Sequence, residues 1–164
     1  MLASRGVGRV IDVRRYPGSR RHPHLERTSL QAGLRERGIA YEWWGDALGG
    51  RRKGRGKKSR HRAWRNDSFR AYADHMESAE FRNALVELER RALEQPPAAI
   101  MCAETLWWRC HRRLIADALV EHGCSVVHLL DSRSHQAHVL HPAARSDESG
   151  GLVYDEGTQG TLIE

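Results

Sequence analysis

The sequence predicts an α/β protein, a single domain whose mostly parallel sheet is flanked by helices in three layers. Short runs typical of strands, at 7–14, 39–44, 98–103 and 125–130, alternate with segments whose apolar residues recur at helical spacing. The chain has 164 residues, which is enough for one domain with a buried core. With 40% hydrophobic and 29% charged residues, it has the composition of a globular protein.

The overall charge favours a polyanionic partner. Lysine and arginine number 27 against 21 for aspartate and glutamate, a net charge of +6. No apolar run approaches the length of a membrane span, and the N-terminus lacks the apolar stretch of a signal peptide. Three cysteines are an odd number and indicate no disulfide framework. We therefore expect a cytoplasmic protein with no membrane partner.

The first strand is expected within VGRVIDVR, residues 7–14, and is followed by a loop with two prolines and a glycine at 16–24. Thr28 or Ser29 is placed to cap a helix that carries two leucines one turn apart. Gly38 is placed to end that helix, because glycine readily takes the left-handed conformation found there. A second strand then starts at the IAYEWW segment.

A basic loop follows at residues 48–62, and we do not expect it to pack as a structural element. Between residues 51 and 62, eight of twelve residues are Lys or Arg, and two more are glycines. Beyond the loop, apolar residues at helical spacing predict one helix over 69–76 and another over 81–92. Ser78 is placed to cap the second of these helices.

A βαβ unit is predicted in the second half of the chain. Its parts are a strand at 98–103, a helix over 109–122 that Gly123 ends, and a strand at 125–130. Such a unit requires a crossover and a parallel pairing of its two strands.

The domain is expected to comprise residues 1–141, with a flexible C-terminal tail at 142–164. Past His141 the chain turns to Ser, Gly, Asp and Glu, which favours a loop or an unfolded segment. The Leu-Val-Tyr run at 152–154 is the one stretch of the tail that could add an edge strand.

Two strand ends carry the polar residues of a predicted site, because ligands of open parallel sheets bind beyond the carboxyl ends of the strands. One end carries Asp12, Arg14, Tyr16, Ser19 and Arg20, and the other is followed by Glu104, His111 and Arg112. If the strands are neighbours, these residues face one cleft. A carboxylate there could steady a cationic intermediate or position a water. The alternatives are a structural ion pair for Asp12 and a helix-dipole partner for Glu104.

The cysteines suggest a zinc site or a thiol nucleophile, and neither is favoured. Paired zinc ligands are usually about two to four residues apart, whereas seven residues separate Cys102 from Cys110. Cys110 and His111 are also adjacent on the expected helix, so their side chains should point apart. We therefore expect no metal. Cys110 beside Arg109 and His111 is the better thiol candidate, because cations favour the thiolate.

Aromatic and basic residues predict contact with nucleic acid. His111 and Arg112 at a helix start suit a phosphate or oxyanion, and an exposed tryptophan such as Trp43 or Trp107 could stack on a base. The basic loop suits a phosphate backbone, although a solvated charge run is the alternative. The expected DNA contacts are Arg51, Arg52, Lys53, Arg55, Lys57, Lys58 and Arg60.

Five segments occur in an order that is specific although each alone is not. They are IDVRRYPGSRR, GIAYEWWGDALGGRR, FRAYADHM, MCAETLWWRCHRRLIADAL and VVHLL, over roughly residues 10–130. This set resembles the bacterial domain-of-unknown-function 488 family. Its matched positions are Asp12, Arg14, Ser19, Arg20, Tyr41, Gly49, Gly50, Glu104, Cys110, His111 and Arg112. Members usually carry a further strand and a Gly-His-Ser turn ahead of the DVR strand, so we expect a sheet that lacks the family's usual first strand.

The resemblance also implies an activity, because some members are associated with removing bases from modified DNA as a defence against phage. The expected protein is a DNA-binding enzyme that hydrolyses the N-glycosidic bond of a modified base and leaves an abasic site. Such cleavage needs a carboxylate and an oriented water, with no cofactor. Asp12 or Glu104 would supply the carboxylate, and His111 would assist the leaving base. The alternatives are a non-catalytic nucleic-acid-binding module and a thiol enzyme that acts on a small anion through Cys110.

Overall fold

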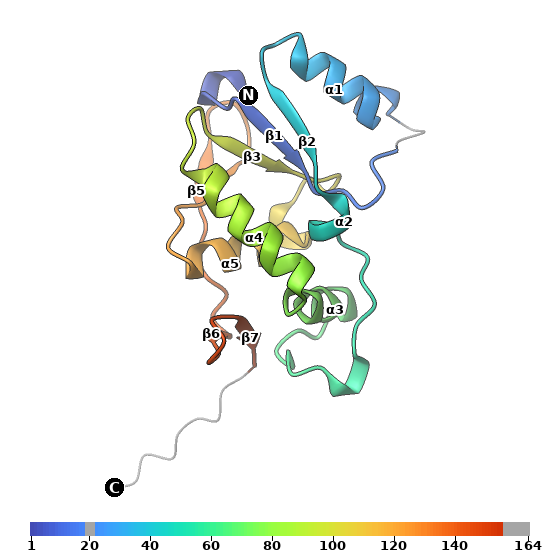
Figure 1. Cartoon of the computed structure of the whole chain (residues 1–164), viewed down its shortest axis with the longest axis vertical. Helices are drawn as coiled ribbons and strands as arrows, with labels where there is room; N and C mark the ends of the chain where they lie inside the picture. Colours follow the sequence, from blue (N-terminus) through green and yellow to red (C-terminus); the bar gives the residue numbers. More distant parts are fainter. Residues whose placement is uncertain (19–21, 156–164) are drawn as a thin grey trace, which may run out of the picture.

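The centre of the protein is a three-stranded parallel sheet in the order β2-β1-β3 (Figure 1). The structure, a computed structural model, describes residues 1–18 and 22–155. The strands are β1 (Arg9–Asp12), β2 (Ala40–Trp43) and β3 (Ala98–Met101). They lie in register, so that Asp12 is opposite the last residue of each neighbour. Three of the four strands expected in the sheet are confirmed, and the protein is a mixed α/β structure.

Helices connect and cover these strands. They are α1 (Arg27–Arg35), α2 (Gly45–Leu48), α3 (Asp67–Met76), α4 (Ala79–Ala92) and α5 (Arg112–Glu121), with 3-10 turns at Ala3–Arg5, Pro23–Leu25, Gly56–Lys58 and Trp107–Arg109. Ser78 caps α4 as predicted, since its hydroxyl accepts the N–H of Phe81 at 3.1 Å. The predicted cap of the first helix was wrong. Because a 3-10 turn leads directly into α1, Thr28 and Ser29 already lie inside its first turn.

Alternate side chains of β1 enter two separate hydrophobic clusters. Val10 packs with Leu34 of α1 and with Ile39. Ile11 and Val13 pack instead with the buried leucines of α4 and α5. The sheet therefore has apolar neighbours on both of its faces. Within the described residues, no helix is both long enough and apolar enough to span a bilayer.

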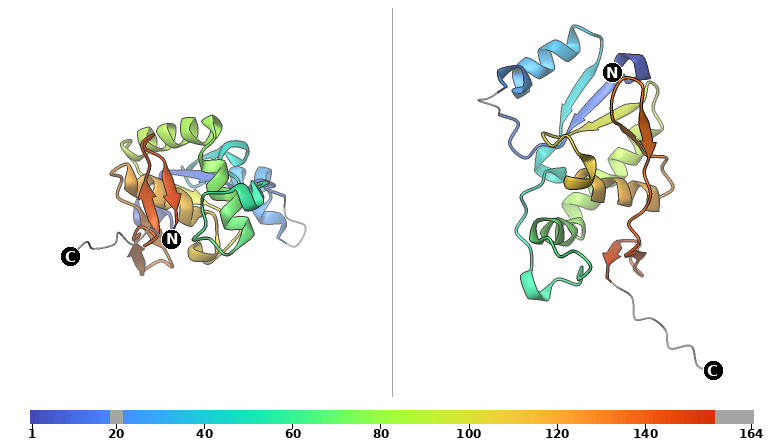
Figure 2. Two further views of the ribbon diagram at one scale, coloured as in Figure 1. Left: turned by 90° about the horizontal axis from the view of Figure 1, so that it is seen from below. Right: turned by 180° about the vertical axis from the view of Figure 1, so that it is seen from behind.

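The predicted βαβ unit was wrong in its last strand. β4 (Val127–Leu129) does not join the parallel sheet but pairs antiparallel with β5 (His135–Ala137). The carboxylate of Asp131 accepts the backbone N–H of Arg133 and Ser134, at 2.6 and 2.8 Å, and turns the chain back on itself. The hairpin stands beside the N-terminal segment (Figure 2), where Arg5 meets His135 at 3.2 Å.

The predicted flexible tail was wrong for residues 142–155. This segment forms β6 (Ala144–Ser146) and β7 (Leu152–Tyr154), which pair antiparallel. The strand expected at 152–154 is therefore present, but it is a core element. All three of its side chains are buried, and that of Tyr154 is completely inaccessible.

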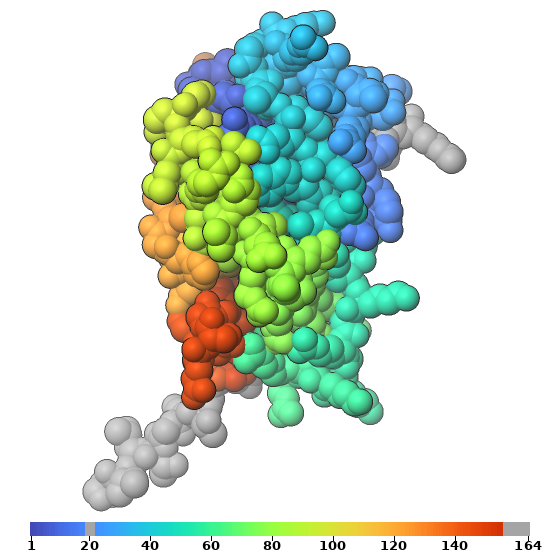
Figure 3. All heavy atoms as spheres, in the orientation of Figure 1, coloured from blue at the N-terminus to red at the C-terminus, as the bar shows by residue number. Residues whose placement is uncertain are grey.

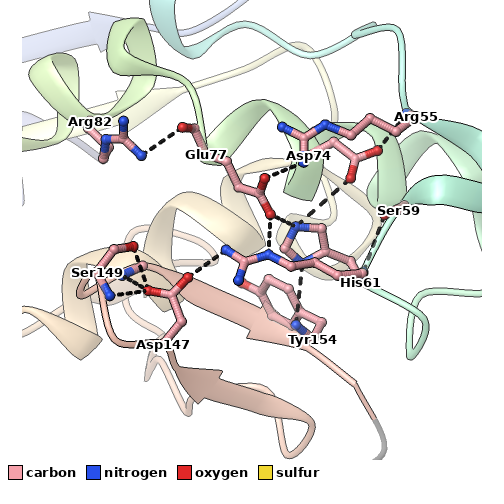
Figure 4. Close-up of polar contacts among 11 residues, drawn as sticks. Arg55, Ser59, His61, Asp74, Glu77, Arg82, Asp147, Ser149 and Tyr154 are labelled. Carbon is pink, nitrogen blue, oxygen red and sulfur yellow. Dashed lines mark hydrogen bonds and ion pairs between the residues drawn. The ribbon is translucent and has the colours of Figure 1, made fainter.

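The end of the basic loop is packed, contrary to expectation, because the C-terminal hairpin docks against it (Figure 4), whereas residues 53–58 are exposed. The ring of His61 is fully buried and accepts the backbone N–H of Tyr154 at 3.3 Å. Arg60 donates to the carboxylate of Asp147 at 2.5 Å and also to Glu77. A sequence pattern cannot reveal this packing, because the partners lie in distant parts of the chain.

Candidate functional site at the carboxyl edge of the sheet

The carboxylate of Asp12 is an ion-pair partner at the end of β1. It is completely buried, and one oxygen lies 2.6 Å from the Nη2 of Arg14. Its other oxygen accepts the backbone N–H and Nε–H of Arg14, at 3.0 and 2.9 Å. The hydroxyl of Tyr41 donates to Asp12 at 2.7 Å. Asp12 therefore does not face the expected cleft. The geometry is that of the structural ion pair given as the alternative for this residue.

The surroundings of Asp12 alter the pKa values of both partners. Burial alone would lower the pKa of Arg14, but the hydrogen bond and charge of Asp12 outweigh it and raise that pKa. Burial raises the pKa of Tyr41, and the hydrogen bond to Asp12 raises it further. Arg14 also donates to the carbonyl of Leu25 at 2.6 Å, so its guanidinium links the strand end to the start of α1.

The loop after β3 exposes Glu104. Its carboxylate has no hydrogen bond or ion pair with residues 1–18 or 22–155. Arg112 does not reach that carboxylate. It donates instead to the main-chain carbonyl of Glu104 and, at 3.5 Å, to that of Thr105. Arg112 therefore shapes the loop that presents Glu104.

Three side chains converge between this loop and the start of α5: Cys102, Cys110 and His111, whose ligand atoms lie within 4.8 Å of one another. Contrary to expectation, the side chains of Cys110 and His111 do not point apart, because neither residue lies inside the helix. Cys110 has extended backbone (φ −125°, ψ 150°), and His111 is the N-cap of α5. This bend lets both side chains face Cys102.

The two thiols influence each other, since Cys102 donates a hydrogen bond to the sulfur of Cys110. That bond lowers the pKa of Cys110 and raises the pKa of Cys102. The neighbouring His111 lowers the pKa of Cys110 further, while burial opposes this. The Nε–H of Arg112 also lies 3.5 Å from the same sulfur. Cys110 is the more acidic thiol, but only 4% of its surface is exposed.

Some of the aromatic rings predicted to contact nucleic acid are covered by other side chains of the protein, and others are exposed. Trp43 donates its indole N–H to the carbonyl of Arg14 at 2.9 Å, and the guanidinium of Arg27 covers its ring. Trp107 is stacked on His128 at 3.8 Å. Trp108 is 44% exposed, which confirms that the paired tryptophans do not both point inward. Tyr16 is 68% exposed, whereas Ser19 and Arg20 lie outside the described residues.

The basic loop contains paired and unpaired cations. Three of the predicted DNA contacts form ion pairs within the protein: Arg52 with Glu80, Arg55 with Glu77, and Arg60 with Glu77 and Asp147. The other four have no carboxylate partner within residues 1–18 and 22–155: Arg51, Lys53, Lys57 and Lys58. Side chains of the loop project from the lower right of the molecule in Figure 3. The loop also borders a cavity of about 550 Å³ lined in part by Lys57, Arg62 and Arg70.

The start of this loop touches the carboxyl-edge site. A Cβ added to Gly50 would lie 2.9 Å from the Nδ1 of His111, so the backbone of Gly50 lies directly against that ring. The guanidinium of the next residue, Arg51, lies over the ring of Tyr16, with 5.9 Å between them. The basic loop and the end of β1 therefore adjoin the cysteine–histidine cluster.

A buried relay of polar side chains was missed by the sequence argument. Asp117 of α5 is fully buried and accepts from His138 at 2.8 Å, and His138 bonds His128 at 2.8 Å. The hydroxyl of Tyr154 donates to the other oxygen of Asp117 at 3.0 Å. An aspartate inside the apolar run LIADAL was the available signal, because a buried carboxylate requires partners.

The group of hydrogen-bonded side chains around Asp117 should make the free energy of unfolding depend on pH. Burial, followed by the charges of His138 and Arg112, lowers the pKa of His128 to about 4. The unfolded chain, with an ordinary histidine pKa of about 6.5, binds this proton first. The free energy of unfolding should therefore fall as the pH drops from about 6.5 through 4, with a slope from this group of at most about 1.4 kcal/mol per pH unit.

The variant His128→Phe keeps a ring against Trp107 and should flatten this decline in urea denaturation series. His61, His75 and His141, whose pKa values burial also lowers, leave a common residual slope in both proteins. Equal slopes for the two proteins would show that His128 takes up its proton without loss of stability.

The protein is therefore an α/β protein with a polar site at the carboxyl edge of its parallel sheet. This site combines a thiol–imidazole cluster with an adjoining basic loop. The sequence model of the family described as "Domain of unknown function DUF488" matches residues 1–119. The chain belongs to this family, which confirms the resemblance. No curated protein and no solved structure matches it. The match ends within α5, so the hairpins that carry His128 and Tyr154 lie beyond it.

Proposed function

We propose that this protein binds DNA across the carboxyl edge of its sheet and hydrolyses the N-glycosidic bond of a modified base, leaving an abasic site. One observation carries the proposal: the backbone of Gly50 lies against His111. A cationic loop that follows a DNA backbone would thereby lead it to the exposed carboxylate of Glu104. In this proposal the protein is a single three-layer domain that acts in the cytoplasm, in defence against phage.

The binding part of the proposal uses the unpaired cations of the basic loop. Arg51, Lys53, Lys57 and Lys58 are free to neutralise phosphates, because no carboxylate of the described residues engages them. Phosphate contacts supply most of the affinity of a protein for DNA and make it salt-dependent. The exposed ring of Trp108 offers a surface on which an extruded base can stack.

The chemical part assigns the carboxylate role to Glu104 rather than to Asp12. N-glycosidic cleavage develops positive charge on the sugar, which an accessible carboxylate stabilises while it orients the attacking water. Glu104 is exposed and unpaired among the described residues, whereas Asp12 is sealed by Arg14 and Tyr41. His111 bonds the carbonyl of Val13 through Nε2, at 3.3 Å, so the role of assisting the leaving base is not given to it.

Replacing Glu104 by Gln should abolish base release while leaving the fold and DNA binding intact. We expect a loss of about 100-fold or more, the usual contribution of a positioned acid–base group. The measurement is incubation with plain and modified phage DNA, followed by mass spectrometry of released bases and a count of alkali-labile sites. Glu36→Gln, an exposed carboxylate at the end of α1, is the matched control.

Full activity of Glu104→Gln would contradict the assignment of that residue. If the unaltered protein releases no base from any modified DNA, the glycosidic proposal itself fails. Salt-dependent gel retardation in that case would favour the non-catalytic binding module.

Neutralising Lys57 and Lys58 together should weaken DNA binding on all sequences. The double variant Lys57→Gln/Lys58→Gln should make the slope of log K against log salt shallower by about 1–2, since each phosphate contact contributes about 0.9. Arg35→Gln/Arg37→Gln removes the same charge at or just beyond the end of α1, at the opposite end of the molecule (Figure 1). Equal slopes for the two double variants would exclude the loop as the DNA contact.

Thiol chemistry is a second candidate because one observation favours it, the lowered pKa of Cys110. A thiolate held by Cys102 and Arg112 could attack a small anionic substrate. Rapid labelling of Cys110 by a thiol reagent near neutral pH would support this function. Only 4% of the surface of Cys110 is exposed, which limits the access of the reagent. If Cys124 reacts and Cys110 does not, Cys110 is inaccessible and the thiol function is excluded.

A further inference from the structure

We propose that Cys102, Cys110 and His111 bind one zinc ion, or a similar borderline divalent metal, with an open fourth position. The two thiol sulfurs and one imidazole nitrogen lie within 4.8 Å of one another. Only a small inward movement is needed for all three to reach a common ion, since zinc lies about 2.3 Å from sulfur and about 2.0 Å from nitrogen. Two thiolates and an imidazole form a recognised donor set of zinc sites that keep one position for water or substrate.

The imidazole of His111 is already oriented as a metal ligand would be. Its Nε2 lies 3.3 Å from the carbonyl oxygen of Val13, which can only accept, so this nitrogen carries the proton. The lone pair is then on Nδ1, which lies 3.6 Å from the sulfur of Cys110. Metal-bound histidines almost always donate their other N–H to a carbonyl or carboxylate, which fixes the ring in this way.

Hydrogen-bond donors surround the two sulfurs and can stabilise the negative charge of metal-bound thiolates. Backbone N–H groups of Ala103 and Glu104 point at the sulfur of Cys102, and the backbone of Arg112 does so for Cys110. The guanidinium of Arg112 adds a donor 3.5 Å from Cys110. On binding, each thiol loses its proton to solvent, so one divalent ion replaces two protons and the two thiolates neutralise its charge.

The alternative to a bound metal is a disulfide bond between Cys102 and Cys110. The third donor decides against it, because a disulfide needs no imidazole lone pair in the same 4.8 Å cluster. Soft thiolate and imidazole ligands select zinc and chemically similar ions over magnesium or calcium. The inference does not depend on the proposed DNA chemistry, because metal binding is measured without DNA.

Cobalt(II) titration of the reduced, chelator-treated full chain tests the site. We expect one equivalent to bind, with a thiolate-to-cobalt charge-transfer band and the strong visible bands of tetrahedral cobalt, and zinc to displace it. Cys102→Ser and Cys110→Ser should each reduce the charge-transfer band and weaken binding by more than the roughly 10–100-fold typical of an outer-shell partner. His111→Ala should shift the visible bands and retain the charge-transfer band.

Cys124→Ser is the matched control, because Cys124 is the third free cysteine and lies outside the cluster. It should leave the cobalt spectrum unchanged. Absence of the charge-transfer band from the unaltered protein would overturn the inference, and so would its loss in Cys124→Ser. The first result needs no variant, so it stands even if a substituted chain fails to fold.

Discussion

Replacing Asp12 by Asn should lower the free energy of unfolding by about 3–5 kcal/mol, the usual cost of removing one partner of a buried ion pair. The reason is that Arg14, only 6% exposed, would keep its charge without the carboxylate that compensates it. The amide keeps only one acceptor oxygen, so either Tyr41 or the Arg14 donors of the other oxygen would also lose their acceptor. Urea denaturation followed by circular dichroism measures the change.

The control is Asp46→Asn, which removes an ion pair of 3.3 Å with Arg15 at a carboxylate that is 70% exposed. An exposed pair of this kind contributes at most about 1 kcal/mol. Tyr41→Phe should lie between the two, at about 1 kcal/mol, because it removes a single hydrogen bond. If Asp12→Asn were as stable as the control but lost base release, Asp12 would be a catalytic rather than a structural carboxylate.

A chain that ends at His141 should fail to fold stably. It lacks β7, whose three side chains are buried, and burial of each contributes about 1.5–3 kcal/mol. The combined loss approaches the whole stability of a typical domain, about 5–15 kcal/mol. It would also leave Asp117 without the hydroxyl of Tyr154 and His61 without its backbone donor.

The matched chain ends at Asp155 and keeps every contact that the structure describes for the two C-terminal strands. It should unfold at the same urea concentration as the full chain, whereas the shorter chain should show no cooperative transition. If the shorter chain instead unfolds cooperatively at the same midpoint, the last hairpin does not stabilise the core. Residues 142–155 would then behave like the flexible tail that the sequence predicted.

Elements with a strong hydrophobic period could be predicted from the sequence. The runs around Val10, Ala40 and Ile100 each became a strand of the sheet, and the apolar residues of α3 and α4 defined their buried faces. The cap at Ser78 could be predicted because capping is local and depends on a side chain three residues from its donor.

The C-terminal strands could not be predicted in the same way. Whether the run at β4 pairs in parallel or folds back depends on the turn at Asp131, and its partner β5 is exposed and carries no apolar pattern. The burial of β7 depends on Trp64, His61 and Asp117, which are distant in the chain but contact Tyr154.

The segment CAETLWWRCHRR shows the same division at the candidate site. Its composition and its place after a strand determined that polar, aromatic and cationic groups would gather at one sheet edge. Chain spacing argued against a metal, yet the extended backbone of Cys110 brings its sulfur to Cys102 and His111. Asp12, one of the two candidate carboxylates of the sequence, proved to be enclosed by Arg14 and Tyr41.

The sequence by itself therefore determined the α/β class, the parallel strands, the family and the edge at which the polar groups collect. These properties follow from local periodicity and from the common direction of parallel strand ends. Only the tertiary structure decided which cations are already paired, which carboxylate is accessible and which side chains form a ligand set. Pairing and burial depend on distances between residues far apart in the chain, and local sequence patterns carry no information about those distances.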